Sequence, residues 1–175
     1  FSSESEVKLL LVTLPDRIPQ SQIFPFHYYA PDLKRLYGAE VREADMDSLL
    51  AGEPLAQRNA DVVAFQTPFD ISDDDLNRLA ALLDKANPGA RFVYLDWCAP
   101  TDIRNAARLD PLVGLYVKKH AFRDRARYGQ PTLGDTNLMD YYARRFDLPE
   151  PETHFAIPPG FMEKMLIGPS FATAP

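Results

Sequence analysis

Residues 92–104 read FVYLDWCAPTDIR, an apolar run of strand length that changes abruptly into a polar and charged cluster. A short, continuous apolar run is typical of a strand that is covered on both faces, as in a parallel sheet. Moving outward from this stretch, the same pattern recurs at strand length in VKLLLVTL (7–14), DVVAFQ (61–66), RFVYLD (91–96) and VGLYVK (113–118), with a weaker fifth strand in AEVREA (39–44). These runs predict the central sheet.

Helical patterns fill the gaps between the strands. FHYYAPDLKRLYG (26–38) has apolar residues at helical spacing and ends on Gly38, a suitable helix C-cap. SDDDLNRLAALLDKANPG (72–89) has Ser72 as N-cap, three acidic residues in its first turn and a leucine stripe. Strands that alternate with helices pair in parallel through right-handed crossovers. The sequence therefore predicts an α/β fold with a doubly wound, mostly parallel sheet in a three-layer αβα sandwich, which is Rossmann-like.

The alternation stops after residue 118. GDTNLMDYYARRF (134–146) indicates a capped helix, with Gly134 in the preceding turn. Residues 148–175 have no clear period and many prolines, so we interpret them as a tail that wraps the domain or links it to another. Residues 1–6 are expected to be disordered or not native to the protein. We expect 1–175 to be a single Rossmann-like α/β domain that belongs to a longer chain.

Composition excludes several classes of protein. A hydrophobic content of 46% in 175 residues suits one folded domain, and a net charge of -6 disfavours nucleic acid as a partner. The single cysteine, Cys98, excludes an internal disulfide framework and favours a cytoplasmic location. No apolar run approaches the roughly 20 residues of a membrane span, so we expect no integral membrane segment.

Polar residues follow the strands at their carboxyl ends. In open parallel sheets, ligands bind at this carboxyl edge, because crossover loops and helix N-termini converge there. We therefore expect the candidate site at this edge, with Asp96, Asp102 and His120 among the side chains that face a ligand. The expected ligand-binding residues are Asp16, Arg17, Gln66, Lys118, Lys119 and Arg123, with Asp70 nearby.

Each candidate also has a structural interpretation. Asp96 or Asp102 could cap a helix that begins near Thr101. Trp97 is better suited to packing than to stacking on a ligand, and Cys98 has no local base and is expected to be inert. The neighbouring lysines disfavour the charged form of His120, which suits a neutral imidazole that acts as a base, although a solvated surface histidine is the alternative.

The segment 118–127, KKHAFRDRAR, is unusually basic for an acidic chain. Arginine binds phosphate and carboxylate groups through its planar fork, so the segment could bind an anion or a partner. The alternative is a solvated, salt-bridged face, because Asp124 interrupts the cluster. Several specific sites are excluded, since the chain has no glycine-rich dinucleotide motif, no P-loop, no zinc spacing and no nucleophile elbow. We expect no metal and no cofactor.

The order of elements, the loop DWCAPTD (96–102) and the stretch LYVKKHAFRDRARYGQPTLGDTNLMDYY (115–142) resemble the N-terminal Rossmann-like domain of bacterial two-domain glycosyltransferases of the GT-B type. In that family the N-terminal domain receives the acceptor, and the second domain supplies most contacts to the nucleotide-sugar. TLPDRIPQSQ (13–22) stands where that family commonly has a glycine-rich loop.

The resemblance implies a sugar or lipid-linked acceptor, a nucleotide-sugar donor and a second domain in the native chain. Asp96, Asp102 and His120 are then the residues able to serve as base at the acceptor hydroxyl. The competing interpretation is a non-catalytic α/β module that binds a small anion or a protein partner at the same edge.

Overall fold

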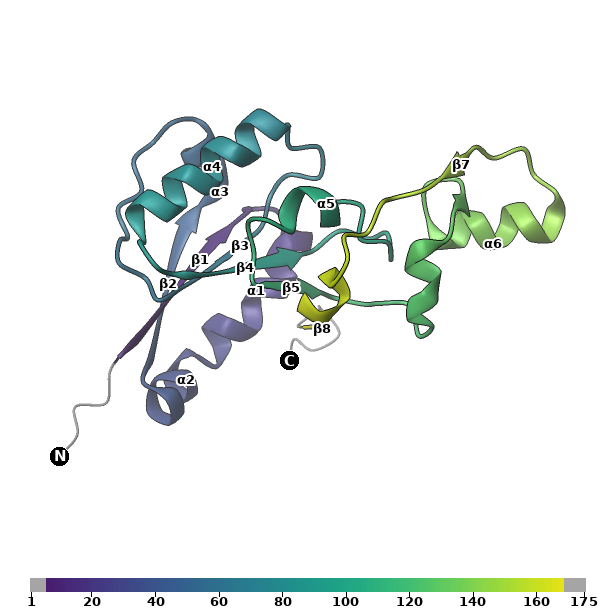
Figure 1. The fold of residues 1–175 in the computed structure, drawn as a ribbon. Coiled ribbons are helices and arrows are strands. Elements are labelled where there is room, and N and C mark those ends of the chain that lie inside the picture. Colours follow the sequence, from purple (N-terminus) through teal and green to yellow (C-terminus); the bar gives the residue numbers. More distant parts are fainter. Residues whose placement is uncertain (1–5, 169–175) are drawn as a thin grey trace.

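The computed structural model, described here for residues 6–168, has a central sheet of six parallel strands in the order β2-β1-β3-β4-β5-β8 (Figure 1). The strands are β1 (Val7–Thr13), β2 (Ala39–Asp45), β3 (Val62–Phe65), β4 (Arg91–Asp96), β5 (Leu115–Lys118) and β8 (Met165–Ile167). Each neighbouring pair is parallel. The predicted fold class and all five predicted strands are confirmed.

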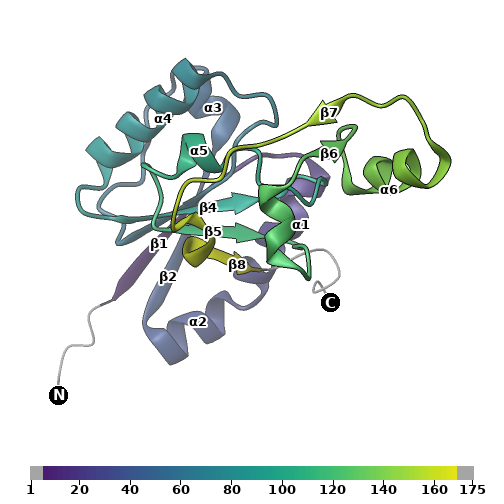
Figure 2. The same cartoon turned by 45° about the vertical axis from the view of Figure 1, so that its right-hand side comes forward.

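Helices lie on both faces of the sheet (Figure 1, Figure 2). One face carries α3 (Met46–Leu50), α4 (Asp73–Ala86) and α5 (Ala106–Leu109), and the other carries α1 (Arg17–Tyr28) and α2 (Ala30–Tyr37). This arrangement is the doubly wound, three-layer sandwich that the alternation of elements predicts. No helix within residues 6–168 is both long enough and apolar enough to cross a membrane.

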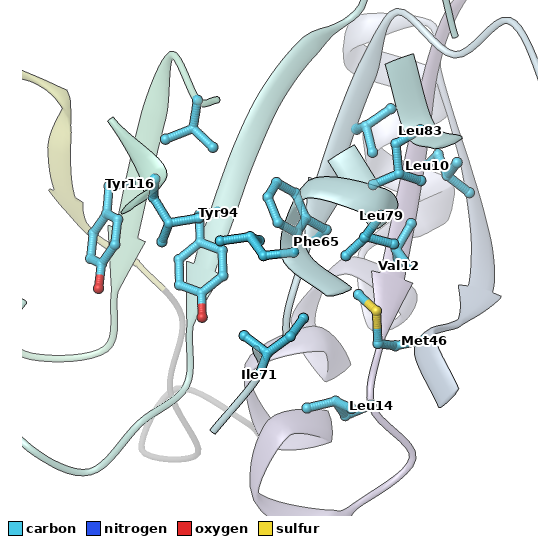
Figure 3. Close-up of a cluster of buried hydrophobic side chains, with 14 of the residues drawn as sticks. Leu10, Val12, Leu14, Met46, Phe65, Ile71, Leu79, Leu83, Tyr94 and Tyr116 are labelled. Carbon is cyan, nitrogen blue, oxygen red and sulfur yellow. The ribbon is translucent and has the colours of Figure 1, made fainter. Parts of the chain in front are cut away.

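Alternation along the strands divides the core into two layers, because successive side chains of a strand point to opposite faces. The larger layer lies under α3, α4 and α5 and includes Leu10, Val12, Phe65, Tyr94 and Tyr116 (Figure 3). The smaller layer lies under α1 and includes Leu11, Ile23, Ala64, Leu95 and Val117. The sequence predicts six buried strand residues, of which five are buried and Val93 is only partly buried; the five are Leu11, Val63, Phe65, Leu95 and Val117.

Helix α4 follows the sequence prediction closely, whereas the single helix predicted over 26–38 is divided at Tyr29 between the end of α1 and α2. In α4 the hydroxyl of Ser72 accepts a hydrogen bond from the backbone N–H of Asp75 at 3.1 Å. The leucines of its buried stripe pack on the sheet. Helix α2 ends at Gly38, which has a φ of 63°. This left-handed conformation is costly for residues with a Cβ atom, so glycine is the favoured C-cap.

Two local predictions were wrong. No helix is predicted for residues 13–22, but α1 begins at Arg17, and its two prolines conceal the helical pattern. No helix begins near Thr101; the chain there forms turns, and α5 starts only at Ala106. Asp102 therefore caps no helix. Its carboxylate accepts from the backbone N–H of Arg104 at 3.1 Å and so shapes a turn instead.

A small lobe, residues 121–157, projects beyond the carboxyl edge of the sheet (Figure 1, Figure 2). It consists of the 3₁₀ turn η1 (Arg125–Gly129), the antiparallel pair β6 (Thr132–Leu133) and β7 (Glu152–Thr153), and α6 (Asn137–Phe146). Thr136 caps α6 by accepting from the backbone N–H of Met139 at 3.2 Å, so the predicted capped helix is confirmed.

After the lobe the chain returns to the sheet through η2 (Phe161–Lys164) and ends its described part in β8. This strand belongs to the region 148–175 in which we found no periodic pattern. Its three residues, Met165, Leu166 and Ile167, are apolar, but this run is too short to indicate a strand from the sequence. Pairing with β5 alone defines it. Residues 1–5 of the segment 1–6, which we expected to be disordered or not native, and the end of the tail, 169–175, lie outside the described residues.

Candidate functional site

Asp96 and Lys118 end neighbouring strands and lie opposite each other in the register of β4 and β5. Lys118 Nζ lies 2.8 Å from Asp96 Oδ2, and only 1% of the lysine side chain and 5% of the aspartate side chain are exposed. The hydroxyl of Tyr116 donates to the same carboxylate oxygen, and the backbone N–H of Cys98 donates to Oδ1 at 2.9 Å. The two charges therefore neutralise each other inside the protein rather than at its surface.

Tyr116 and Cys98, which both donate to Asp96, are buried as well. Burial, followed by the charge of Asp96, raises the pKa of Tyr116 well above its usual value, so this phenol stays protonated as a hydrogen-bond donor. The same two causes raise the pKa of the Cys98 thiol to about 12, which agrees with the expectation that this cysteine is inert. Trp97 donates its indole N–H to the carbonyl of Thr67 at 2.9 Å and packs on the core, as its structural interpretation requires.

His120 lies two residues after β5 and is partly buried. Its Nε2 lies 2.8 Å from the carbonyl oxygen of Ala99, in the loop that follows β4. A carbonyl can only accept, so Nε2 carries the proton and Nδ1 keeps its lone pair when the ring is neutral. Burial, and then the charges of Lys118 and Lys119, lower the pKa of His120 against an opposing effect of the Ala99 carbonyl. The predicted direction is confirmed, although burial outweighs the lysines as the cause.

Lys119 lies between these groups and is partly buried. Burial lowers the pKa of its ammonium group, although the carboxylate of Asp96 opposes this change. Three consecutive basic residues therefore lie at the carboxyl edge: Lys118 is buried and paired with Asp96, whereas Lys119 and His120 are partly buried. Together with Asp96 and Asp102, they lie on one edge of the sheet, as the sequence predicts.

Asp102 belongs to a clamp centred on Arg104. The guanidinium of Arg104 donates to both carboxylate oxygens of Asp102, at 2.9 and 2.8 Å, and to Oδ1 of Asp135 in the lobe at 2.9 Å. Its carbon Cζ also lies over the rings of Phe69 and Phe155, at 5.2 and 4.9 Å from their centres. The hydrogen bonds to Asp102 raise the pKa of Arg104, so the clamp keeps its charge at any ordinary pH. It ties the loop after β4 to the lobe.

The residues after β1 and β3 have a different environment. Gln66 is fully buried: it accepts from the backbone N–H of Leu14 at 3.3 Å and donates to the carbonyl of Pro19 at 3.0 Å. It therefore fastens the start of α1 to the sheet. Asp16 and Arg17 lie at the start of α1 and are exposed. The structure thus keeps Gln66 away from solvent and leaves these two open to it.

The basic segment does not form one patch. Lys118 points inward to Asp96, and Arg125 donates to the sulfur of Met165 at 3.5 Å. Arg127 stacks on the ring of Phe122, with Cζ 4.6 Å from its centre, and pairs with Asp140 of α6 at 3.4 Å. Arg123 is exposed. The segment is therefore partly a salt-bridged face and partly a source of separate surface charges.

Three charged residues that bind one another or the site loop were not predicted from the sequence: Arg104, Asp140 and Arg144. Asp140 is buried and accepts from Arg144 Nε at 2.8 Å and from the backbone N–H of Leu133 at 2.8 Å. The spacing of four residues between Asp140 and Arg144 within a capped helix was an available signal for an ion pair. The contact of Arg104 with Asp135 spans 31 residues, and no local pattern predicts it.

The carboxyl edge has little enclosed space. The cavity that Asp102, Ile103 and Tyr128 help to line has a volume of about 20 Å³. Larger hollows lie elsewhere: one of about 350 Å³ is lined by residues of α4 and by Leu112, and one of about 670 Å³ lies at the amino ends of β4 and β5. Neither of these hollows is lined by Asp96, Asp102 or His120, and His120 is partly buried at the carboxyl edge. We therefore place the candidate site by its chemistry rather than by the size of a hollow.

Among residues 6–168, no group of three histidine, cysteine or acidic side chains is arranged to hold a metal ion. Comparison of this chain with models of protein families, with curated proteins and with solved structures found no match.

Proposed function

We propose that this chain is the acceptor-binding half of a glycosyltransferase that uses a nucleotide-sugar donor, with His120 as the base at the acceptor hydroxyl. The observation that carries the proposal is the His120 ring, held by the Ala99 carbonyl at the carboxyl edge of a parallel sheet. This contact leaves Nδ1 as the proton acceptor, and the lowered pKa keeps the ring neutral near pH 7. A neutral, oriented imidazole is the group that general-base catalysis requires.

The proposed reaction transfers the sugar from the donor to the oxygen of the acceptor hydroxyl. Nδ1 of His120 takes the proton of the acceptor hydroxyl while its oxygen forms a bond to the anomeric carbon of the donor sugar. The bond from that carbon to the diphosphate oxygen breaks, and its electron pair leaves with the nucleoside diphosphate. Because the hydroxyl attacks from the face opposite the leaving group, the product has inverted stereochemistry.

We assign the base to His120 rather than to either aspartate because of their existing partners. The carboxylate of Asp96 accepts from Tyr116, Lys118 and the Cys98 backbone and is buried. Asp102 is held by both nitrogens of the Arg104 fork. Protonating either carboxylate during a reaction would break charge-assisted hydrogen bonds, which are the strong ones in proteins.

The proposal includes a donor-binding domain that covers the carboxyl edge. The cavity at this edge is too small for a sugar, so binding requires an opposing surface. Lys119 and Arg123 would then face the diphosphate of the donor across the cleft. The lobe, which Arg104 fixes to the site loop, would form one wall for the acceptor.

A non-catalytic binding module is the second candidate. The observation that favours it is the open, shallow carboxyl edge together with the exposed apolar side chains of α6, Leu138, Tyr141 and Phe146. Exposed apolar clusters of this kind mark interaction surfaces. In this case the edge would bind a small anion or a protein partner without turnover.

Turnover by the protein that carries this chain separates the two candidates. The assay measures release of UDP from UDP-glucose or of GDP from GDP-mannose in the presence of a mixture of sugar and lipid-linked acceptors. We expect His120→Ala to lower the rate by about 10²–10⁴-fold, the usual contribution of a general base. His154→Ala, a change at an exposed histidine, is the matched control and should have no effect. Equal turnover in both variants would reject the assignment, and ligand binding without turnover would favour the module.

A further inference from the structure

A surface hollow of about 370 Å³ lies on the lobe, apart from the site around His120. Its lining comes from η1 and α6 and consists of Arg127, Asn137, Asp140, Tyr141, Arg144 and Arg145. Three guanidinium groups therefore converge on a space that contains one carboxylate. None of these residues takes part in the chemistry proposed above.

Asp140 holds the hollow together. Its buried carboxylate accepts from Arg144 Nε at 2.8 Å through Oδ1 and pairs with Arg127 at 3.4 Å through Oδ2. Arg144 also donates to the carbonyl of Pro131 at 3.3 Å, and Arg127 rests on the ring of Phe122. Two of the arginines are thus held in place before any ligand arrives, which reduces the entropy lost on binding.

The charges in the hollow do not balance. One carboxylate offsets one of the three arginines, which leaves a local excess of two positive charges. Arg145 is exposed and forms no ion pair with any residue in the range 6–168. Like charges that are held close together repel unless an anion lies between them. The whole chain has a net charge of -6, so this excess is a local feature.

We propose that this hollow binds a phosphate monoester group. A phosphate monoester carries a charge of about -1.5 to -2 at pH 7, which matches the excess of two positive charges, whereas a carboxylate would offset only one. Arginine forks bind phosphate oxygens in a bidentate manner. Each guanidinium has five N–H donors, so Arg127 and Arg144 keep unused donors beside those that bind Asp140.

Uncharged donors complete the site. Asn137 uses its amide oxygen to accept from Thr101 at 2.9 Å, so its amide N–H groups remain available to a ligand. The phenol of Tyr141 lines the same space. The bond from Asn137 to Thr101 also connects this hollow to the loop that follows β4. The inference does not depend on glycosyl transfer, because it rests on contacts within the lobe.

The phosphate group could belong to a free metabolite or to a lipid headgroup, and two probes distinguish these sources. The first is inorganic phosphate, followed through the side-chain Nε–H signals of the arginines by NMR. The second is vesicles of phosphatidylcholine with one tenth phosphatidic acid, followed by co-sedimentation. We expect saturable shifts of Arg127, Arg144 and Arg145 with inorganic phosphate, saturable co-sedimentation with the vesicles, or both, and an affinity that falls as salt rises.

Variants make the test specific. Arg145→Gln should weaken binding at least fivefold, and Arg127→Gln should do the same. The matched control is Arg58→Gln, a change at an exposed arginine before β3, which should leave the affinity unchanged. Binding of vesicles alone identifies the lipid headgroup as the source, and binding of inorganic phosphate identifies a free phosphate. The proposal is overturned if the unmodified protein shows neither saturable shifts with inorganic phosphate nor saturable co-sedimentation with the vesicles, or if Arg58→Gln weakens binding as much as Arg145→Gln.

Discussion

Replacing Asp96 by Asn would leave the ammonium group of Lys118 buried without a countercharge. The change keeps the size of the side chain but removes the partner that lies 2.8 Å from Nζ. The change also replaces one acceptor oxygen of the carboxylate with an NH₂ group, which can only donate. The native carboxylate accepts on Oδ2 from Lys118 and Tyr116 and on Oδ1 from the Cys98 backbone, so an amide N–H must face a donor on one of these two sides.

The expected cost follows from the burial of both groups. Breaking a buried ion pair by removing one partner destabilises a protein by about 3–5 kcal/mol. For a domain of this size, 1 kcal/mol lowers the melting temperature by roughly 2–4 °C. We therefore expect Asp96→Asn to lower the melting temperature by about 6–20 °C. A loss of this size is a large part of the roughly 5–15 kcal/mol that stabilises a typical domain.

Urea denaturation followed by circular dichroism measures this cost. The matched control is Asp32→Asn, which removes an ion pair with Arg35 that is 2.8 Å long but exposed on both sides. Exposed pairs contribute close to zero, so the control should unfold near the midpoint of the native protein. If both variants unfold at the same urea concentration, the buried pair does not carry the energy assigned to it, and the reasoning fails.

Two further predictions concern His120 and the turn before α6. The folded-state pKa of His120 lies below its unfolded value of about 6.5, so the unfolded chain binds more protons in this window and stability falls as the pH drops below about 6.5 towards the folded pKa. Urea midpoints between pH 7.5 and 5 should decrease less for His120→Gln than for the native protein, and parallel curves would contradict the lowered pKa. Gly134→Ala should destabilise the protein by at least about 1 kcal/mol, because Gly134 has a φ of 74° and an added Cβ would lie 2.9 Å from Cβ of Met139. Gly129→Ala is the control, since its site is open; calorimetry that ranks the two variants equally would refute the turn argument.

The sequence by itself determined the fold class, because the information for it is local. Apolar runs of strand length predict buried parallel strands, and Ser72 and Gly38 mark helix ends through bonds to their near neighbours. The same reasoning predicts which loops share the carboxyl edge. That edge follows from strand direction alone, so the positions of Asp96 and His120 were predictable.

The roles of the residues at that edge were decided by the tertiary structure. Asp96 and Lys118 are 22 residues apart, and only the register of β4 and β5 brings a predicted catalytic residue and a predicted ligand-binding residue together as one buried ion pair. Asp102 is likewise held by an arginine that also binds the lobe.

Strand β8 and the arginine hollow on α6 depend on contacts between segments distant in sequence. Strand β8 pairs with the edge of β5. Arg127 and Arg144 lie close together because both bind the carboxylate of Asp140. Periodicity reports which face of an element is buried, whereas the partner of a charged group depends on how elements pack. The fold could therefore be predicted from local patterns, and the electrostatics of the site could not.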